Sequence, residues 1–454
     1  MGAIPGNIDA DRAPPMTIPL RHFVVGLGFL LSALLVGAAG SLEWAIGTSG
    51  LSYIHLLLAG WICVTIMGAM TQFVPVWSGV AIHSKRLATA QLWLVTAGLV
   101  GFVAALLSGA FEWLAIGAVV MLSGFWIFAY NVGRTLSSAR PWDVTERHFA
   151  LGLGFFVLLT ALGVPLAIGV TREPFSGLPI GHENVRVAHA TLAVFGAVLT
   201  TIFGALYQLA TMFTQTELDR IDEGIQRFET ISYPIGVICL AGGRFVGIVS
   251  VARVGGTIVA LCVLGVGVIL LRKLYETRVA RTPMVHRYAV VAVAMVLWAL
   301  LALPAWIVDP LAADRLYGAS GTVHLLAFGI IGFVVVGTLY HVVPFIVWVH
   351  RYSDLLGLSD VPMIDDLYDD RLARVDFVSI FAGTVGLVAG DLLSAPAAVR
   401  SLSAGVLLFG ASVFVANMLL VVYRHSPHGL VGVLCDRFVS ESGDETSTMP
   451  ADRT

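Results

Sequence analysis

Three histidines within long apolar stretches are the residues of this sequence best suited to chemistry. His55, His189 and His324 each begin an apolar run, and they are separated by 134 and 135 residues. An ionisable side chain inside a membrane-length apolar run costs free energy and indicates a functional site. Neutral imidazole is a common ligand of haem iron, so two such histidines on facing helices would suit a haem held between them. A structural alternative stays open, in which each imidazole lies at the membrane interface and duplication accounts for the spacing.

Each of the three histidines is followed by a similar glycine-containing pattern: Gly68-Ala-Met-Thr-Gln72, Gly204-Ala-Leu-Tyr-Gln208 and Gly337-Thr-Leu-Tyr-His341. Small residues at helical spacing let helices or a flat macrocycle approach closely, and they are equally typical of ordinary membrane packing. His341 lies about 25 Å from His324 along a helix, so the two cannot share an iron. We interpret His341 as part of a structural polar pair. A proton or substrate path through Tyr207, Tyr340 and His341 is the alternative.

The composition is that of a membrane protein. The chain has 454 residues, of which 57% are hydrophobic and 12% charged, whereas about a quarter of the residues of soluble domains are charged. The four cysteines show no metal-type spacing, and the three that lie in apolar segments are expected to be small buried hydrophobes. The net charge of −3 gives no reason to expect a nucleic-acid partner. No cleavable signal pattern precedes the first apolar run, which is expected to remain in the bilayer.

Apolar runs of about 20 residues predict an all-α membrane protein with twelve transmembrane helices. The runs cover roughly 23–43, 51–76, 88–108, 112–134, 148–170, 187–212, 230–248, 254–272, 287–308, 321–348, 376–394 and 401–423. The predicted membrane domain, 23–423, lies between an N-terminal tail, 1–22, and a C-terminal tail, 424–454. The histidine spacing predicts three pseudo-symmetric four-helix arcs around an axis along the membrane normal. These repeats cover roughly 23–134, 148–272 and 287–423.

The distribution of positive charge predicts that both termini are cytoplasmic. The loops of the opposite face hold six of the 26 Lys and Arg residues: Arg172, Arg186, Arg244, Arg253, Arg315 and Arg400. An excess of positive charge marks the cytoplasmic side, which places the three histidines near the outer face. The other histidines considered, expected to be solvated in polar cytoplasmic loops or tails, are His83, His148, His286, His350, His425 and His428.

With these features the chain resembles the haem–copper oxidase subunit I superfamily, and within it the NnrS-like proteins. The resemblance rests on histidines in spans 2, 6 and 10 of twelve, on GAMTQFVPVWSG (Gly68 to Gly79) and on HLLAFGIIGFVVVGTLY (His324 to Tyr340). It implies a haem b with His55 and His324 as axial ligands. It places His189 on the span that supplies a copper ligand in the oxidases, and we expect His189 to be a third candidate ligand of the haem. It further implies a protein of the cytoplasmic membrane in electron transfer or nitric oxide response. The implied partners are a redox protein or other respiratory subunits.

The copper-ligand pattern of the oxidases is incomplete in this chain. Thr322 and Leu326 flank His324 where a His-x-His is typical, and the segment 233–244 lacks the histidine pair of span 7. Neither a copper centre nor oxygen reduction is therefore expected, and enzymatic activity as an oxidoreductase stays open. Two other classes also stay open. One is a twelve-helix secondary transporter without a cofactor, for which a repeat of half the chain would be typical, and the other is a structural subunit that has lost its haem.

Overall fold

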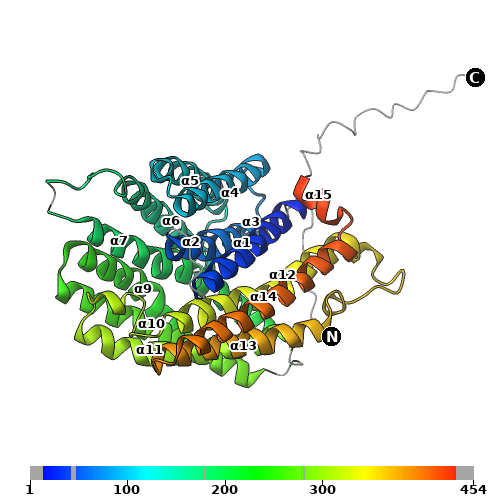
Figure 1. The fold of residues 1–454 in the computed structure, drawn as a ribbon. Helices are drawn as coiled ribbons and strands as arrows, with labels where there is room; N and C mark the ends of the chain where they lie inside the picture. Colours follow the sequence, from blue (N-terminus) through cyan, green and yellow to red (C-terminus); the bar gives the residue numbers. More distant parts are fainter. Residues whose placement is uncertain (1–13, 42–47, 178, 278, 280–281, 436–454) are drawn as a thin grey trace, which may run out of the picture.

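The computed structural model describes residues 14–41, 48–177, 179–277, 279 and 282–435. All regular secondary structure among these residues is helical (Figure 1). The principal elements are α1 (Thr17–Ser41), α2 (Ser49–His55), η1 (Leu56–Cys63), α3 (Val64–Ser78), α4 (Lys85–Ser108), α5 (Leu114–Ser137), α6 (Val144–Ile168), α7 (His182–Thr191), η3 (Leu192–Val198), α8 (Leu199–Thr214), α9 (Arg220–Val246), α10 (Val249–Glu276), α11 (Pro283–Val308), η5 (Leu325–Gly332), α12 (Phe333–Arg351), α13 (Asp370–Leu392), α14 (Ala397–His425) and α15 (Gly429–Cys435).

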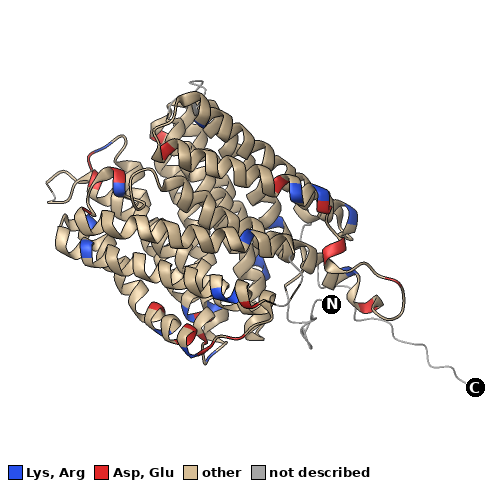
Figure 2. Cartoon of the chain, turned by 90° about the horizontal axis from the view of Figure 1, so that it is seen from below, with Lys and Arg blue, Asp and Glu red and all other residues tan. Residues whose placement is uncertain are grey.

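Eleven helices among the described residues are long and apolar enough to cross a membrane. Three of them contain a π segment, because α2–η1–α3, α7–η3–α8 and η5–α12 each run as one continuous helix. Figure 2 shows charged residues mainly at helix ends and in connecting loops, with long uncharged stretches of helix between them. Such a distribution suits contact with a lipid bilayer.

Helix α9 is the long helix that falls outside this group. It has 27 residues, and its buried face carries Asp222, Glu229 and Arg244. The opposite face carries more than half-exposed apolar side chains, among them Ile231 and Ile238. Helix α9 is thus polar toward the protein and apolar toward the outside, so its average hydropathy stays low.

The three histidine-headed helices are the most buried of the bundle. In their most apolar stretches 72–83% of the residues are buried, against 33–56% for the other eight candidate spans. Each contains a π-helical segment close after its histidine, since η1 and η5 begin one residue after His55 and His324, and η3 begins three residues after His189. π segments are rare and occur frequently at functional sites. The same local structure therefore recurs at the sequence spacing of the histidines.

Close helix hairpins also recur, formed by α4 with α5, α9 with α10, and α13 with α14. In each hairpin a glycine faces the backbone of the partner helix. A Cβ added at Gly98, Gly255 or Gly383 would come closer than 3.0 Å to a main-chain nitrogen of that partner. These hairpins are packed backbone to backbone, a typical use of small residues in membrane proteins.

Candidate functional site

A partly open, mainly apolar cavity of about 240 Å³ lies between the first and second histidine helices. Its walls come from α2, η1, α4, α5, α6, α7 and η3. His55 and His189 both line it, and both are half-buried. The structure therefore brings two of the three predicted site histidines to one space.

The His55 ring is fixed by its own helix. Its Nδ1 donates a hydrogen bond to the main-chain oxygen of Leu51, at 2.9 Å. A carbonyl oxygen can only accept, so Nδ1 carries the proton and the neutral ring presents the lone pair of Nε2. The Phe102 ring lies beside the imidazole, with the two centroids 4.9 Å apart.

The His189 ring is fixed by a different helix. Its Nδ1 donates to the main-chain oxygen of Leu159 on α6, at 2.8 Å. Gly163 makes room for the ring, because a Cβ at that position would lie 3.3 Å from Cε1 of His189. As in His55, the lone pair of the neutral ring is on Nε2.

The two histidines therefore present similar donor atoms. Among the described residues, neither Nε2 has a hydrogen-bond partner. Metal-binding histidines typically donate the other ring N–H to a carboxylate or a main-chain carbonyl, which fixes the tautomer and the ring orientation. His55 and His189 have this arrangement. An apolar cavity with two such imidazoles could hold an iron porphyrin or another metal-containing group.

His324 does not line this cavity. Its Nδ1 lies 2.5 Å from a carboxylate oxygen of Asp391 on α13, and its ring stacks on Phe328. The pair is partly exposed, with 26% of the His324 side chain and 19% of the Asp391 side chain accessible. The structure thus separates His324 from the space shared by His55 and His189. The predicted roles of all three as iron ligands stay predictions.

A buried arginine, Arg244, lies near the end of the cavity that Tyr317 lines. The Arg244 guanidinium of α9 donates to the main-chain oxygens of Pro310, Arg315 and Leu316 and to the hydroxyl of Thr191. These bonds tie the loop after α11 to α7. The next residue, Tyr317, lines the cavity, and burial raises the pKa of its phenol, which therefore stays protonated. His182 and Arg186, both exposed, also line this end.

Three buried polar clusters recur below the histidines, and sequence reasoning missed them. Each cluster joins one histidine-headed helix to the long helix before it and to the long helix after it. The cluster residue on the histidine-headed helix lies three residues after the glycine of the repeated pattern, which is Gly68, Gly204 or Gly337. The clusters are Thr71 with His22 and Gln91, Tyr207 with His148 and Glu229, and Tyr340 with Arg287 and Asp376.

The middle cluster corrects the expectation for His148. This residue was expected to be solvated in a loop, but it is 1% exposed inside α6. Its Nδ1 donates to Val144, and its Nε2 lies 3.0 Å from the Glu229 carboxylate, which also accepts from the Tyr207 hydroxyl at 2.9 Å. A buried ionisable pair of this kind avoids the high cost of an unpaired charge.

The third cluster contains a charged pair of residues. Arg287 bonds to Asp376, whose other oxygen accepts from the Tyr340 hydroxyl. Asn417 of α14 donates to that hydroxyl at 3.0 Å. Every oxygen of the Asp376 carboxylate thus has a partner, which favours a structural role for this cluster.

His341 does not form the expected polar pair. Its ring packs between the aromatic rings of Phe213 and Phe345, with centroid distances of 4.5 and 5.7 Å. Tyr207 and Tyr340 belong to separate clusters, so no hydrogen-bonded path among the described residues joins them to His341. The four cysteines, all of them described, are free thiols.

No protein-family model matches the chain, and no curated protein matches it in sequence. Among the described residues, no group of three or more His, Cys, Asp and Glu side chains is arranged to hold a metal ion. A site that uses two ligands, such as His55 and His189, is a different arrangement from such a group.

Proposed function

We propose that this chain is an integral membrane haem-binding protein of oxidase subunit I type without the copper centre. The observation that carries the proposal is the cavity lined by His55 and His189, each with Nδ1 fixed by a carbonyl and Nε2 without a partner. This geometry favours His55 and His189 as a ligand pair over the pair His55 and His324. In this proposal His324 and Asp391 form a separate site.

The proposed architecture has twelve membrane helices in three four-helix units. Helix α9 supplies the twelfth, because its exposed face is apolar and its charged residues point into the protein. The recurrence of the π segments, the close hairpins and the polar clusters supports three units, each with a histidine helix second in order. Both termini are proposed to be cytoplasmic, from the positive-charge bias of the loops.

A haem bound here would supply one-electron chemistry. His55 and His189 would hold the iron, while the mainly apolar walls would lower the local dielectric. A haem held by both histidines would carry single electrons, to or from a redox partner or other respiratory subunits. A role in nitric oxide response is the second role within this proposal. The cavity of about 240 Å³ is smaller than typical small-molecule sites, roughly 300–1,000 Å³, so the lining side chains would have to move apart to admit a macrocycle.

The test is a reduced-minus-oxidised visible spectrum of the purified protein after incubation with haem b, with the bound haem counted as its pyridine complex. We expect a b-type signal that is lost in His55→Ala and His189→Ala and kept in His324→Ala. His341→Ala is the matched control, because its ring also lies inside the bundle but outside the cavity. Loss in His55→Ala and His324→Ala, with His189→Ala unaffected, would instead establish the other ligand pair.

A protein that stays colourless with haem would overturn the proposal. The secondary transporter would then be the leading class, because buried ionisable residues such as His148 and Glu229 are typical of substrate and proton paths. Uptake by proteoliposomes would be the next measurement for that class.

A further inference from the structure

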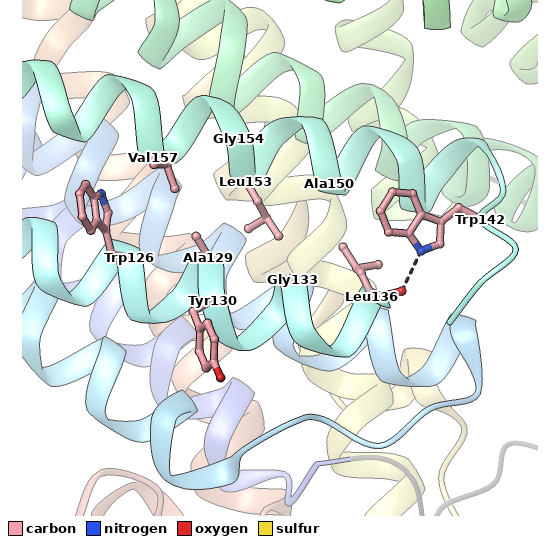
Figure 3. Close-up of a pocket in the computed structure, with 10 residues that line it drawn as sticks. All are labelled: Trp126, Ala129, Tyr130, Gly133, Leu136, Trp142, Ala150, Leu153, Gly154 and Val157. Atoms are coloured by element: carbon pink, nitrogen blue, oxygen red, sulfur yellow. Dashed lines mark hydrogen bonds between the residues drawn. The ribbon is translucent and has the colours of Figure 1, made fainter. Parts of the chain in front are cut away.

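An apolar groove of about 400 Å³ lies between α5 and α6, away from the histidine cavity (Figure 3). We call it the α5–α6 groove. Trp126 and Val157 lie at one end, and Leu136 and Trp142 lie at the other, next to the turn that joins the two helices. Its lining also contains small residues, among them Gly133 and Gly154. Since Gly154, Val157 and Trp126 are exposed, the groove opens to the outside of the bundle.

The length of the groove matches half of a membrane. From Leu136 to Trp126 the groove follows α5 for ten residues, which is about 15 Å at 1.5 Å per residue. The hydrocarbon core of a bilayer is about 30 Å thick, so one leaflet provides about 15 Å. An extended acyl chain that enters at the turn between α5 and α6 would therefore fill the groove as far as Trp126 and Val157.

The end of the groove at this turn carries positive charge. Arg134, Arg140 and Arg147 lie within or beside the turn, and all three are exposed. The guanidinium of Arg140 lies 4.8 Å from the ring centroid of Trp142, which itself lines the groove. No ion pair of these arginines is present among the described residues.

The acidic groups next to them are occupied in capping α6. Asp143 accepts from the main-chain nitrogen of Glu146 at 3.0 Å, and Glu146 accepts from that of Asp143 at 2.8 Å and from the hydroxyl of Ser78. The turn therefore offers cationic groups at the depth where a phospholipid headgroup lies. Basic residues at the membrane end of an interhelical pocket are typical of anionic lipid sites.

We propose that the α5–α6 groove binds an anionic phospholipid, with one acyl chain between Trp126 and Trp142 and the phosphate at Arg140. Its apolar walls would accept the chain of any phospholipid, and the arginines would select for negative headgroups. The proposal is independent of haem binding, because none of these residues lines the histidine cavity.

Native mass spectrometry of the detergent-purified protein tests the proposal. The protein is mixed with phosphatidylglycerol and phosphatidylcholine of identical acyl chains, and the retained lipid is identified by its mass. We expect wild type to retain phosphatidylglycerol preferentially. Arg140→Gln should weaken this retention about fivefold, the effect of one basic residue at the membrane surface, and leave phosphatidylcholine unchanged.

A second variant tests the groove itself. Gly154→Leu should abolish retention of both lipids, and it should fold because a Cβ at Gly154 meets open space. Arg172→Gln and Gly405→Leu are the matched controls, since both positions are exposed and lie outside the groove, and a Cβ at Gly405 also meets open space. Equal retention of the two lipids by wild type would overturn the proposal, and so would wild-type retention in Arg140→Gln or Gly154→Leu. A wild-type dimer that Gly154→Leu dissociates would also overturn it, by assigning the groove to a second copy of the chain.

Discussion

The Nδ1 of His189 donates to the carbonyl of Leu159, thirty residues earlier in the chain and on a different helix. His55, in contrast, is fixed by Leu51, four residues earlier on its own helix. The orientation of the His189 ring therefore depends on how α6 packs against α7. The hydrogen bond that orients the His55 ring lies within a single helix.

This difference predicts that α6 controls the chemistry of His189. Gly163→Val should displace the ring, because even a Cβ at this position lies 3.3 Å from Cε1. We expect a shifted or weakened haem signal in the reduced-minus-oxidised spectrum, with a folded protein. Gly154→Val is the control on the same helix, where a Cβ meets open space. An unchanged spectrum in Gly163→Val would contradict the assignment of His189 as a ligand.

The buried pair Arg287 and Asp376 should be important for stability. Asp376→Asn leaves the Arg287 charge without its partner in an apolar surrounding, which typically costs about 3–5 kcal/mol. The measurement is thermal unfolding in detergent. The exposed pair Arg227 and Glu223 gives the control, because Glu223→Gln removes an i,i+4 ion pair typically worth about 0.3–0.5 kcal/mol.

A double variant separates charge burial from packing. Arg287→Met combined with Asp376→Leu removes both charges, and buried pairs replaced by apolar residues often lose little stability. We expect the double variant to be more stable than Asp376→Asn alone. The opposite order would mean that hydrogen bonds of Arg287 to Pro283 and Ala373 contribute more than the charge pair.

Much of the helix layout could be predicted from the apolar runs, and the buried partners could not. The predicted span 187–212 corresponds to a helix from His182 to Thr214, and 321–348 to one from Leu325 to Arg351. Hydropathy measures how apolar a segment is, and it does not show which way each side chain faces. His148 stands among polar residues at the start of α6, and its partner Glu229 lies 81 positions away, so the sequence suggested a loop.

The direction in which each histidine side chain points could not be predicted either, and the reason is related. Sequence spacing gives the depth of a residue along a helix, whereas its rotation depends on every turn between it and the packing contacts. The π segments after His55, His189 and His324 change the direction in which the side chains face around the helix. No pattern in the sequence predicted these segments. The pairing of His55 with His189 in one cavity is therefore a result of the structure alone.

The helix hairpins should be sensitive to one methyl group. Gly98→Ala places a Cβ against the backbone of Met121, and overpacking of this kind typically costs about 1–3 kcal/mol. Gly101→Ala on the same helix meets nothing within 4 Å and should be neutral or slightly stabilising. Thermal unfolding of both variants in detergent is the measurement. Equal melting temperatures would contradict backbone contact between α4 and α5.

The N-cap of α13 should make a pH-dependent contribution to stability. Asp369 accepts from the main-chain nitrogens of Leu372 and Arg371, and these bonds lower the pKa of its carboxyl. A carboxyl whose pKa is lower in the folded state stabilises the protein above its unfolded pKa, about 3.9. This stabilisation is lost as the pH falls through the folded value.

The variant Asp369→Ala tests this sign. It should lower the melting temperature at pH 7, and the difference from wild type should shrink below about pH 4. Asp360→Ala, at an exposed position of the same loop, is the control. A difference that stays constant down to pH 3 would show that the charge of Asp369 plays no part.

The inside-out character of α9 has a consequence for biosynthesis. One face of α9 carries Asp222, Glu229 and Arg244. If α9 entered lipid alone, each charge near the centre of the bilayer would cost about 2.5–3.5 kcal/mol of insertion free energy. The partners of Glu229 and Asp222 are close in the order of synthesis: His148 and Tyr207 come before α9, and Lys273 follows on the next helix. In the twelve-helix proposal, α9 would therefore leave the insertion machinery together with its neighbours, and α6 to α10 would enter the membrane as one group.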